Sequence, residues 1–489
     1  MTAWSSSRTT LAMVEAVVSA GRLRGRRIET PDGVACAFLG VPYAGNAPRF
    51  RPAPPVQQWS GRREARDPGP AAPQTAGGSE HGCLTVNVWT PETAADRPVF
   101  VWIHGGLHVA GSNAEPFCDG ARLAARTGSV VVAVNYRLGA LGFLTLDHLL
   151  GDEFRSCANL GLHDTIAALA WIRAEIAAFG GDADRVTLAG QSAGATSVAM
   201  LLAAPRSAGL FRRAVLQSAS PERIGSREYG EEVTADLLSL LAAVPEQLLD
   251  LPCPRLIEAQ DRLLARRSAA GPNTVAVFRA NLDGHLLTRD PVSAVAAGAS
   301  SGVDLIITTN VNDGSGAVDL RAPNSPELRA QLDRHLAELL PGGDATAYRE
   351  ALAAELGRAP SDAEALEACL SDEIYRQPSQ RLLDARAAAT GSTHAALFAW
   401  RVNDSRGATH SLELPFLFRS LDAARAMIGP TPHHLSEEIS TRWAEFAATG
   451  DPGWPEYRPG RTTLVLDDPL RIVDAPREHL RRLVAEHHR

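Results

Sequence analysis

The sequence predicts an α/β protein in which a mostly parallel sheet is flanked by helices. Two short, continuous apolar runs, residues 98–103 (PVFVWI) and 129–134 (SVVVAV), are typical of strands buried on both faces. Residues 159–179 then place apolar side chains at helical spacing, before another strand-like run at residues 186–189 (VTLA). Strand, helix and strand in this repeated order imply a parallel sheet with helices on its faces.

Later parts of the chain extend this pattern and interrupt it. Strand-like runs return at residues 305–309 (LIITT) and 396–402 (ALFAWRV). The regions from about 221 to 298 and from about 320 to 390 are instead rich in Ala, Leu, Glu and Arg with helical periodicity. We interpret both as helical insertions. No linker rich in Gly or Ser divides the chain, so residues 1–489 are predicted to form a single domain.

The composition is that of a globular protein without a strong overall electrostatic field. The chain is 45% hydrophobic and 21% charged, with a net charge of −8. This balance would not draw the protein to nucleic acid or to anionic lipid, so we expect neither as a partner. No uncharged apolar run approaches the roughly 18 residues that a membrane span requires.

The amino terminus and the cysteines bear on location. The apolar patch within residues 1–21 is interrupted by Glu15 and preceded by a single basic residue, Arg8, which makes a poor signal peptide. The six cysteines are scattered without a CxxC pair, which indicates neither a zinc site nor a dense disulfide framework. We expect a cytoplasmic protein with reduced thiols, and the sequence leaves its oligomeric state open.

The stretch Gly190-Gln191-Ser192-Ala193-Gly194 stands where a strand gives way to a helix. In a G-x-S-x-G motif the glycines relieve crowding in a sharp turn that lifts the serine above the carboxyl edge of the sheet. The new helix directs its first N–H groups at the same place, which favours negative charge. Ser192 is therefore a candidate nucleophile, and the alternative is a tight turn of purely structural origin.

A serine needs a base, which in this architecture follows it in the order serine, acid, histidine. Nine histidines follow Ser192. His410 comes after a strand and a short polar loop, where a base could reach the serine, whereas His335 lies in a polar helical pattern and is expected to be solvated. Three residues separate the strand-like run 305–309 from Asp313, which could orient an imidazole. The alternatives are a hydrogen-bonded loop histidine and a structural Asp-Gly turn.

An acyl-transfer intermediate also needs donors for its oxyanion. His104-Gly105-Gly106-Leu107 directly follows the strand-like run 98–103, where backbone N–H groups could converge on the serine. Tandem glycines after a strand are otherwise an ordinary turn.

With these residues, the chain resembles the type-B carboxylesterases, the cholinesterase-like branch of the α/β-hydrolases. The resemblance covers nearly the full length of the chain. The matching stretches are AFLGVPYAGNAPRFRPAPPVQQW, CLTVNVWTP, VWIHGG, NYRLGALGFL, FGGDADRVTLAGQSAGA, GATHSLELPFLF and WAEFAATGDPGWP. The resemblance implies an α/β-hydrolase fold whose helical insertions shape the substrate pocket. It also implies that no metal or cofactor is required.

The resemblance assigns roles residue by residue. Ser192 would be the nucleophile, His410 the general base and Asp313 the acid. The oxyanion would be held by backbone N–H groups of Gly105, Gly106 and Leu107 and by that of Ala193. Arg137 and Asp164 would form a structural ion pair that braces the sheet edge.

The chain departs from the family pattern at several positions. Gln191 replaces the usual Glu before the nucleophile, which removes a negative charge, and Asp313 is one methylene shorter than the usual Glu. Leu107 and His108 stand where the family has Gly or Ala followed by an aromatic residue, and we expect the Leu107 side chain to point into the acyl pocket. The customary disulfide partner of Cys83 is missing upstream, so that thiol is predicted to be free.

The leading hypothesis is a serine hydrolase that cleaves carboxylic esters through an acyl-enzyme. A second hypothesis keeps the site and changes the outcome to acyl transfer, lactone formation or a lyase step. A third is a catalytically inactive scaffold for protein contacts, against which the three retained triad residue types argue.

Overall fold

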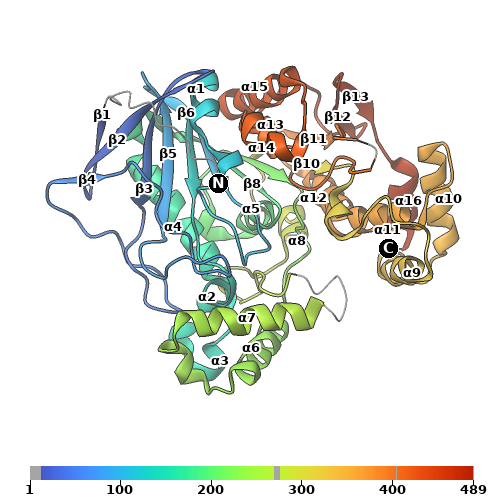
Figure 1. Cartoon of the computed structure of the whole chain (residues 1–489), viewed down its shortest axis with the longest axis horizontal. Helices are drawn as coiled ribbons and strands as arrows, with labels where there is room; N and C mark the ends of the chain where they lie inside the picture. Colours follow the sequence, from blue (N-terminus) through green and yellow to red (C-terminus); the bar gives the residue numbers. More distant parts are fainter. Residues whose placement is uncertain (1–12, 269–275, 404, 488–489) are drawn as a thin grey trace.

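The computed structural model describes residues 13–268, 276–403 and 405–487, and a single twisted sheet runs through it (Figure 1). The sheet has 13 strands in the order β1-β2-β3-β5-β7-β6-β8-β9-β10-β11-β12-β13, with β4 beside β2. Its middle, from β7 to β12, is parallel throughout. The prediction of a mostly parallel central sheet between helices is confirmed.

The parallel strands are those that the continuous apolar runs predicted, together with two more. Their bounds are β6 (Arg97–Ile103), β7 (Val130–Val134), β8 (Gly181–Gln191), β9 (Arg213–Gln217), β10 (Asp304–Asn310), β11 (Thr393–Phe398) and β12 (Thr462–Leu466). The expected strand 396–402 was placed too late, because β11 begins at Thr393 and ends at Phe398, where the chain leaves the sheet.

An antiparallel extension at the amino-terminal edge escaped the sequence prediction. It comprises β1 (Met13–Val18), β2 (Gly21–Thr30), β3 (Gly33–Pro42) and β5 (Thr85–Pro91), and the short β4 (Arg62–Glu64) pairs in parallel with β2. At the other edge, β13 (Arg471–Asp474) is antiparallel to β12. Residues 1–12, on which most of the signal-peptide prediction rests, lie outside the described residues.

Side chains alternate between two cores because successive residues of a strand face opposite sides of the sheet. In β6, Val99 and Val101 belong to one buried cluster, whereas Phe100 and Trp102 belong to the other. Helices cover both faces, as Figure 1 shows. Those that pack on the first cluster include α4 (Leu160–Glu175), α5 (Ala193–Ala203) and α8 (Pro291–Ala296), and those on the second include α1 (Ala121–Thr127), α13 (Leu414–Leu417), α14 (Leu421–Ile428) and α15 (His433–Thr449).

Helices make up much of the two regions interpreted as insertions. The first holds α6 (Arg227–Leu241), α7 (Cys253–Ser268) and α8. Of these, α6 and α7 lie near α2 (Gly139–Phe143) and α3 (Asp147–Leu150) at the lower edge of Figure 1. The second, at the right of that view, holds α9 (Pro326–Leu339), α10 (Ala345–Leu356), α11 (Asp362–Ser371), a π-helical turn (Asp372–Arg376) and α12 (Gln377–Ala385). With α16 (Glu478–His487), α9, α10 and α11 enclose a third, smaller core.

The prediction that His335 is solvated is wrong. Its side chain in α9 is 5% exposed, and its Nδ1 lies 2.6 Å from Oε2 of Glu373. The predicted pair of Arg137 and Asp164 is confirmed as a buried, two-pronged contact, with Nε–Oδ2 at 2.7 Å and Nη2–Oδ1 at 2.6 Å. It ties the loop after β7 to the second turn of α4.

Other expectations concern the thiols and the membrane. All six cysteines, each of them within the described residues, are free thiols, Cys83 among them. Burial raises the pKa of Cys83 to about 12, so this thiol stays protonated at neutral pH. Among the described helices, none is long and apolar enough to cross a bilayer.

Candidate active site

Ser192 occupies a strained turn between β8 and α5. Its φ of 56° and ψ of −124° are unusual for a residue with a side chain. The flanking glycines leave room for this turn: a Cβ on Gly190 would lie 2.6 Å from the carbonyl carbon of Gly194, and one on Gly194 would lie 2.1 Å from the carbonyl oxygen of Ile103. Both glycines of the motif are therefore required, because a side chain at either position would clash with the backbone. This is the geometry of a nucleophile elbow.

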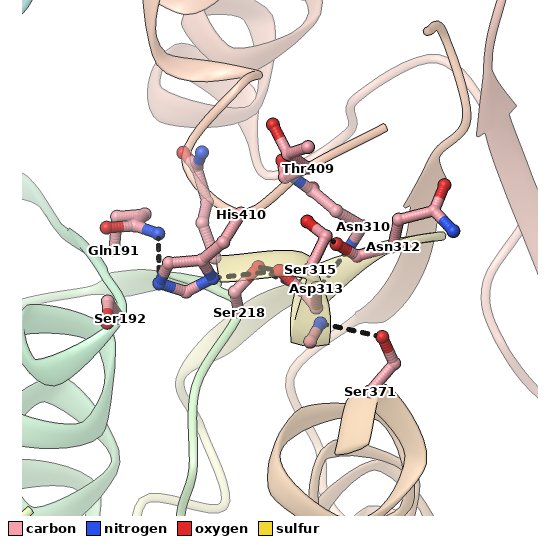
Figure 2. A network of polar contacts seen from close by, with 12 residues as sticks. Gln191, Ser192, Ser218, Asn310, Asn312, Asp313, Ser315, Ser371, Thr409 and His410 are labelled. Atoms are coloured by element: carbon pink, nitrogen blue, oxygen red, sulfur yellow. Dashed lines mark hydrogen bonds and ion pairs between the residues drawn. The ribbon is translucent and has the colours of Figure 1, made fainter. Parts of the chain in front are cut away.

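His410 and Asp313 meet beyond the carboxyl ends of neighbouring parallel strands. Asp313 begins a short 3-10 helix (Asp313–Ala317) after β10, and His410 lies in the loop after β11. Nδ1 of His410 is 2.9 Å from Oδ1 of Asp313 (Figure 2). A carboxylate accepts hydrogen bonds only, so Nδ1 carries the proton and Nε2 is left with its lone pair.

The Asp313 carboxylate is held by further donors and is fully buried. The Ser218 hydroxyl lies 2.9 Å from each carboxylate oxygen, and the backbone N–H of Asn310 donates to Oδ2 at 2.7 Å. The loops that carry acid and base are joined as well, because Asn312 and Ala408 are hydrogen bonded, backbone N to backbone O, at 3.0 Å. Acid and base are thus fixed relative to one another before any substrate binds.

The Nε2 lone pair of His410 faces Gln191, the residue before the serine. The side-chain amide of Gln191 donates to Nε2 at 3.1 Å, as Figure 2 shows. Within the described part of the chain, Gln191 rather than Ser192 is the hydrogen-bond partner of Nε2. The sequence drew attention to Gln191 as a lost charge, but this contact was not foreseen.

Tyr375 is a second residue that the sequence did not single out. It lies in the π-helical turn after α11, and its ring stacks on that of His410 with centroids 4.8 Å apart and planes 29° from parallel. Burial raises the pKa of Tyr375 to about 12, so it remains a neutral phenol, while an interaction with the Ser192 side chain acts on that pKa in the opposite direction. Tyr375 therefore stacks on His410 and lines the same pocket as Ser192.

The loop after β6 approaches the serine from the other side. A Cβ on Gly105 would lie 3.0 Å from the carbonyl oxygen of Gln191 and 3.1 Å from Cβ of Ser192. Gly106 has a φ of 103°, and a Cβ there would lie 2.2 Å from the carbonyl oxygen of Ala110. Leu107 and His108 also have positive φ, 55° and 59°, so this loop keeps a glycine-like backbone at two residues with side chains.

Two buried histidines support this loop and carry no charge at neutral pH. Burial lowers the pKa of His104 to about 4 and that of His108 to about 4. Nε2 of His108 lies 2.9 Å from Oγ of Ser197 in α5, and the ring packs on Phe143 with centroids 4.6 Å apart. His108 thus takes the place of an aromatic side chain that braces the loop against α5.

A buried acid, Glu413, lies near His410. Glu413 accepts hydrogen bonds from the side-chain amides of Asn310 at 2.7 Å and Gln217 at 3.1 Å. Burial raises the pKa of Glu413, and the negative charge of Asp313 raises it further. Its hydrogen bonds anchor β9 and β10 below the triad.

A small pocket of about 30 Å³ opens at the serine. Its walls include Leu107, His108, Ala193 and Tyr375, so Leu107 borders the space beside Ser192. Over the described residues, no group of three or more His, Cys, Asp or Glu side chains is arranged to hold a metal ion.

A serine elbow, an imidazole paired with a carboxylate and a glycine loop at one edge of a parallel sheet define a serine hydrolase of the α/β-hydrolase fold. Residues 12–465 match the carboxylesterase family. The chain belongs to the carboxylesterase family.

Individual relatives agree with this assignment. The chain is 34% identical to the para-nitrobenzyl esterase of Bacillus subtilis (strain 168), over 94% of this chain and 96% of that protein. It is 31% identical to the fumonisin B1 esterase of Sphingopyxis macrogoltabida, over 88% of this chain and 83% of that protein. A solved PNB esterase superposes with a TM-score of 0.83 at 31% identity, covering 96% of this chain and 99% of the other.

These findings decide between the hypotheses drawn from the sequence. The protein is a carboxylic ester hydrolase that acts on small-molecule esters. Acyl transfer, lactone formation, a lyase step and an inactive scaffold receive no support from the relatives, which are named as esterases.

Proposed function

We propose that Ser192, His410 and Asp313 are the catalytic triad of this esterase. The observation that carries the proposal is the contact of His410 Nδ1 with Asp313 at 2.9 Å, which turns the unprotonated Nε2 toward the serine elbow. Asp313 orients the imidazole and stabilises its cation without taking a proton itself.

The reaction runs in two displacements. Ser192 Oγ attacks the ester carbon while Nε2 of His410 takes the hydroxyl proton, and that proton then goes to the departing alcohol oxygen as its bond to carbon breaks. Water attacks the acyl-enzyme in the same way, with His410 again as base, and releases the acid and free Ser192.

The oxyanion of each intermediate would be held by backbone N–H groups of the Gly105-Gly106-Leu107 loop and of Ala193. Gly105 closely approaches Ser192, and Ala193 is the first residue of α5, whose N-terminal N–H groups favour negative charge. Before attack, His410 must release Gln191 so that Nε2 can accept the proton of Ser192. Ester binding therefore completes the catalytic contact.

We further propose that residues 1–489 act as one domain whose two helical regions wall the pocket, and that the enzyme is cytoplasmic. Ala276 and Tyr375 come from those regions and line the pocket. Six free cysteines suit a reducing compartment. Cell fractionation with an antibody to the protein tests the location.

The triad is tested with Ser192→Ala on 4-nitrophenyl acetate and with a fluorophosphonate probe. We expect turnover and labelling to be lost while thermal unfolding stays unchanged. Ser293→Ala, an exposed serine of α8, is the matched control and should keep both. If Ser192→Ala kept more than a small fraction of wild-type turnover, the nucleophile would be a different residue.

A further inference from the structure

The pocket at Ser192 has a strongly asymmetric charge. Arg223 and Arg279 both line it, and of its described lining residues none is an aspartate or a glutamate. His108 adds no charge at neutral pH, because burial lowers its pKa to about 4. The interior beside the nucleophile is therefore positive, although the chain as a whole has a net charge of −8.

Arg279 is held in place by neutral groups. Its Nε donates to the carbonyl oxygen of Ala276 at 2.8 Å, and its Nη2 donates to the hydroxyl of Tyr229 at 2.9 Å. Its guanidinium carbon also lies 4.3 Å from the centre of the Tyr229 ring. These contacts fix the side chain, and none of them comes from a carboxylate, so its charge is positioned without being neutralised by a described acidic group.

Arg223 reinforces that charge from another element. Burial lowers its pKa and repulsion from Arg279 lowers it further, whereas Tyr375, Glu373 and Glu338 act in the opposite direction. Neither of these acids lines the pocket. A carboxylate bound in the pocket would reduce the repulsion between the two guanidinium groups.

We propose that this esterase acts on esters that carry a carboxylate group, which binds in the Ser192 pocket between Arg223 and Arg279. The proposal rests on the assignment of Ser192 as nucleophile and adds the substrate class. The planar, fork-like donors of arginine suit a carboxylate, and a hydrogen bond to a charged partner is about twice as strong as a neutral one.

Two matched pairs of esters test this on the whole protein. In the first pair, 4-acetoxybenzoate and 4-acetoxybenzamide, the group that differs is on the alcohol side. In the second, the 4-nitrophenyl esters of 4-carboxybenzoic and 4-carbamoylbenzoic acid, it is on the acyl side. Carboxylate and carboxamide have nearly the same shape, so the ratio of kcat/KM within a pair measures the effect of charge.

In the wild type we expect at least one pair to favour the carboxylate by roughly 10-fold to 100-fold. Arg279→Gln and Arg223→Gln should each reduce that ratio about tenfold, and Arg279→Lys, which keeps the charge, should retain part of it. Arg289→Gln, an exposed arginine outside the pocket, changes the net charge equally and should leave the ratio as it is.

The outcomes separate this proposal from the one on which it rests. If all four esters are hydrolysed in a Ser192-dependent way and neither pair favours the carboxylate, or if the preference persists in both glutamine variants, the charged pocket has another role. If Ser192→Ala instead stayed active in every assay, Ser192 would not be the nucleophile, and this proposal would fall with that assignment. Should the arginine variants fail to fold, benzoate must still inhibit wild-type turnover of a neutral ester more strongly than benzamide, and equal inhibition would refute the proposal.

Discussion

The side-chain amide of Gln191 donates a hydrogen bond to Nε2 of His410 at 3.1 Å, on the atom that accepts the proton of Ser192 in the proposed mechanism. The proposed base is therefore occupied, at rest, by the residue before the proposed nucleophile. A neutral hydrogen bond contributes about 0.5–1.5 kcal/mol, which is small enough to be exchanged when an ester binds. The contact holds the imidazole in the correct tautomer and turns Nε2 toward the elbow.

Gln191→Glu should change how the enzyme responds to pH. The imidazole must be neutral to act as base, so kcat/KM should fall as the solution is acidified within the range of about pH 5 to 8 in which histidine changes charge. A carboxylate at position 191 would stabilise the imidazolium and move this acidic limb upward by about 1 pH unit. The measurement is the pH profile of kcat/KM on 4-nitrophenyl acetate.

Gln191→Met is the control for this shift. It removes the donor, adds no charge and nearly conserves volume, so its acidic limb should stay much closer to that of the wild type. Burial keeps His104 and His108 neutral down to a pKa of about 4, so neither can produce a limb between pH 5 and 8. Identical profiles for all three proteins would show that residue 191 does not affect the catalytic base.

Asp313→Asn should lower kcat far more than its small change in shape suggests. The carboxylate accepts from His410 Nδ1, from Ser218 and from the backbone of Asn310, and an amide could donate to Nδ1 and reverse the tautomer. In triads of this kind the loss in kcat is about 10⁴-fold. Single-turnover assays of Asp313→Asn measure it, with Asp313→Glu, the acid usual in the family, retaining an intermediate rate. Wild-type turnover in Asp313→Asn would remove Asp313 from the triad.

The parts of this fold that the sequence predicted are those with a strong local pattern. β7 is buried at every position, so its residues form an unbroken apolar run that can be recognised without a structure. β2 (GRLRGRRIET) is mostly half-buried and carries four arginines, and its strand state depends on pairing with β1 and β3. Such edge strands take their stability from neighbours that the local sequence does not specify.

The site divides in the same way. Ser192, Asp313 and His410 follow strands that the sequence predicted, and their motifs encode the turns that carry them. Tyr375 reaches His410 from a π-helical turn about sixty residues beyond Asp313 in the chain, and no local pattern marks this contact. His335 did carry a signal: Leu332, Leu336 and Leu339 lie on its face of α9, and that apolar face outweighs its polar neighbours in sequence.

Leu107→Gly should widen the range of acyl groups that the enzyme accepts. The Leu107 side chain lines the pocket beside Ser192, and its φ of 55° is kept at a cost of about 1 kcal/mol. Removing the side chain should raise kcat/KM for 4-nitrophenyl isobutyrate relative to the acetate by about tenfold, the effect of about 1.4 kcal/mol of lost steric conflict. Leu107→Ala opens the space but keeps the backbone strain, so it should give a smaller gain in the same ratio. An unchanged ratio in both variants would show that Leu107 does not limit the acyl group, and an equal gain on both esters would point to the oxyanion donors.

The last prediction concerns acid stability, which the two buried histidines should weaken. In the unfolded chain a histidine takes up its proton near pH 6.5, whereas burial holds the folded pKa of His104 and of His108 at about 4. Between these values the unfolded state binds more protons, so their contribution to stability is complete above about pH 6.5 and is lost as the pH falls toward 4. For each histidine the loss is on the order of 3 kcal/mol. The raised pKa values of the buried acids Glu367 and Glu413 have the opposite effect on the pH dependence of stability. Both acids are present in the wild type and in the variant, so their effect cancels when the two proteins are compared. Urea unfolding at pH 7.5, 6 and 5 should therefore show a shallower loss of the free energy of unfolding in His108→Gln than in the wild type. His285→Gln changes an exposed histidine and should show the same dependence of the unfolding free energy on pH as the wild type. If His108→Gln also matched the wild type, His108 would not be kept neutral by burial.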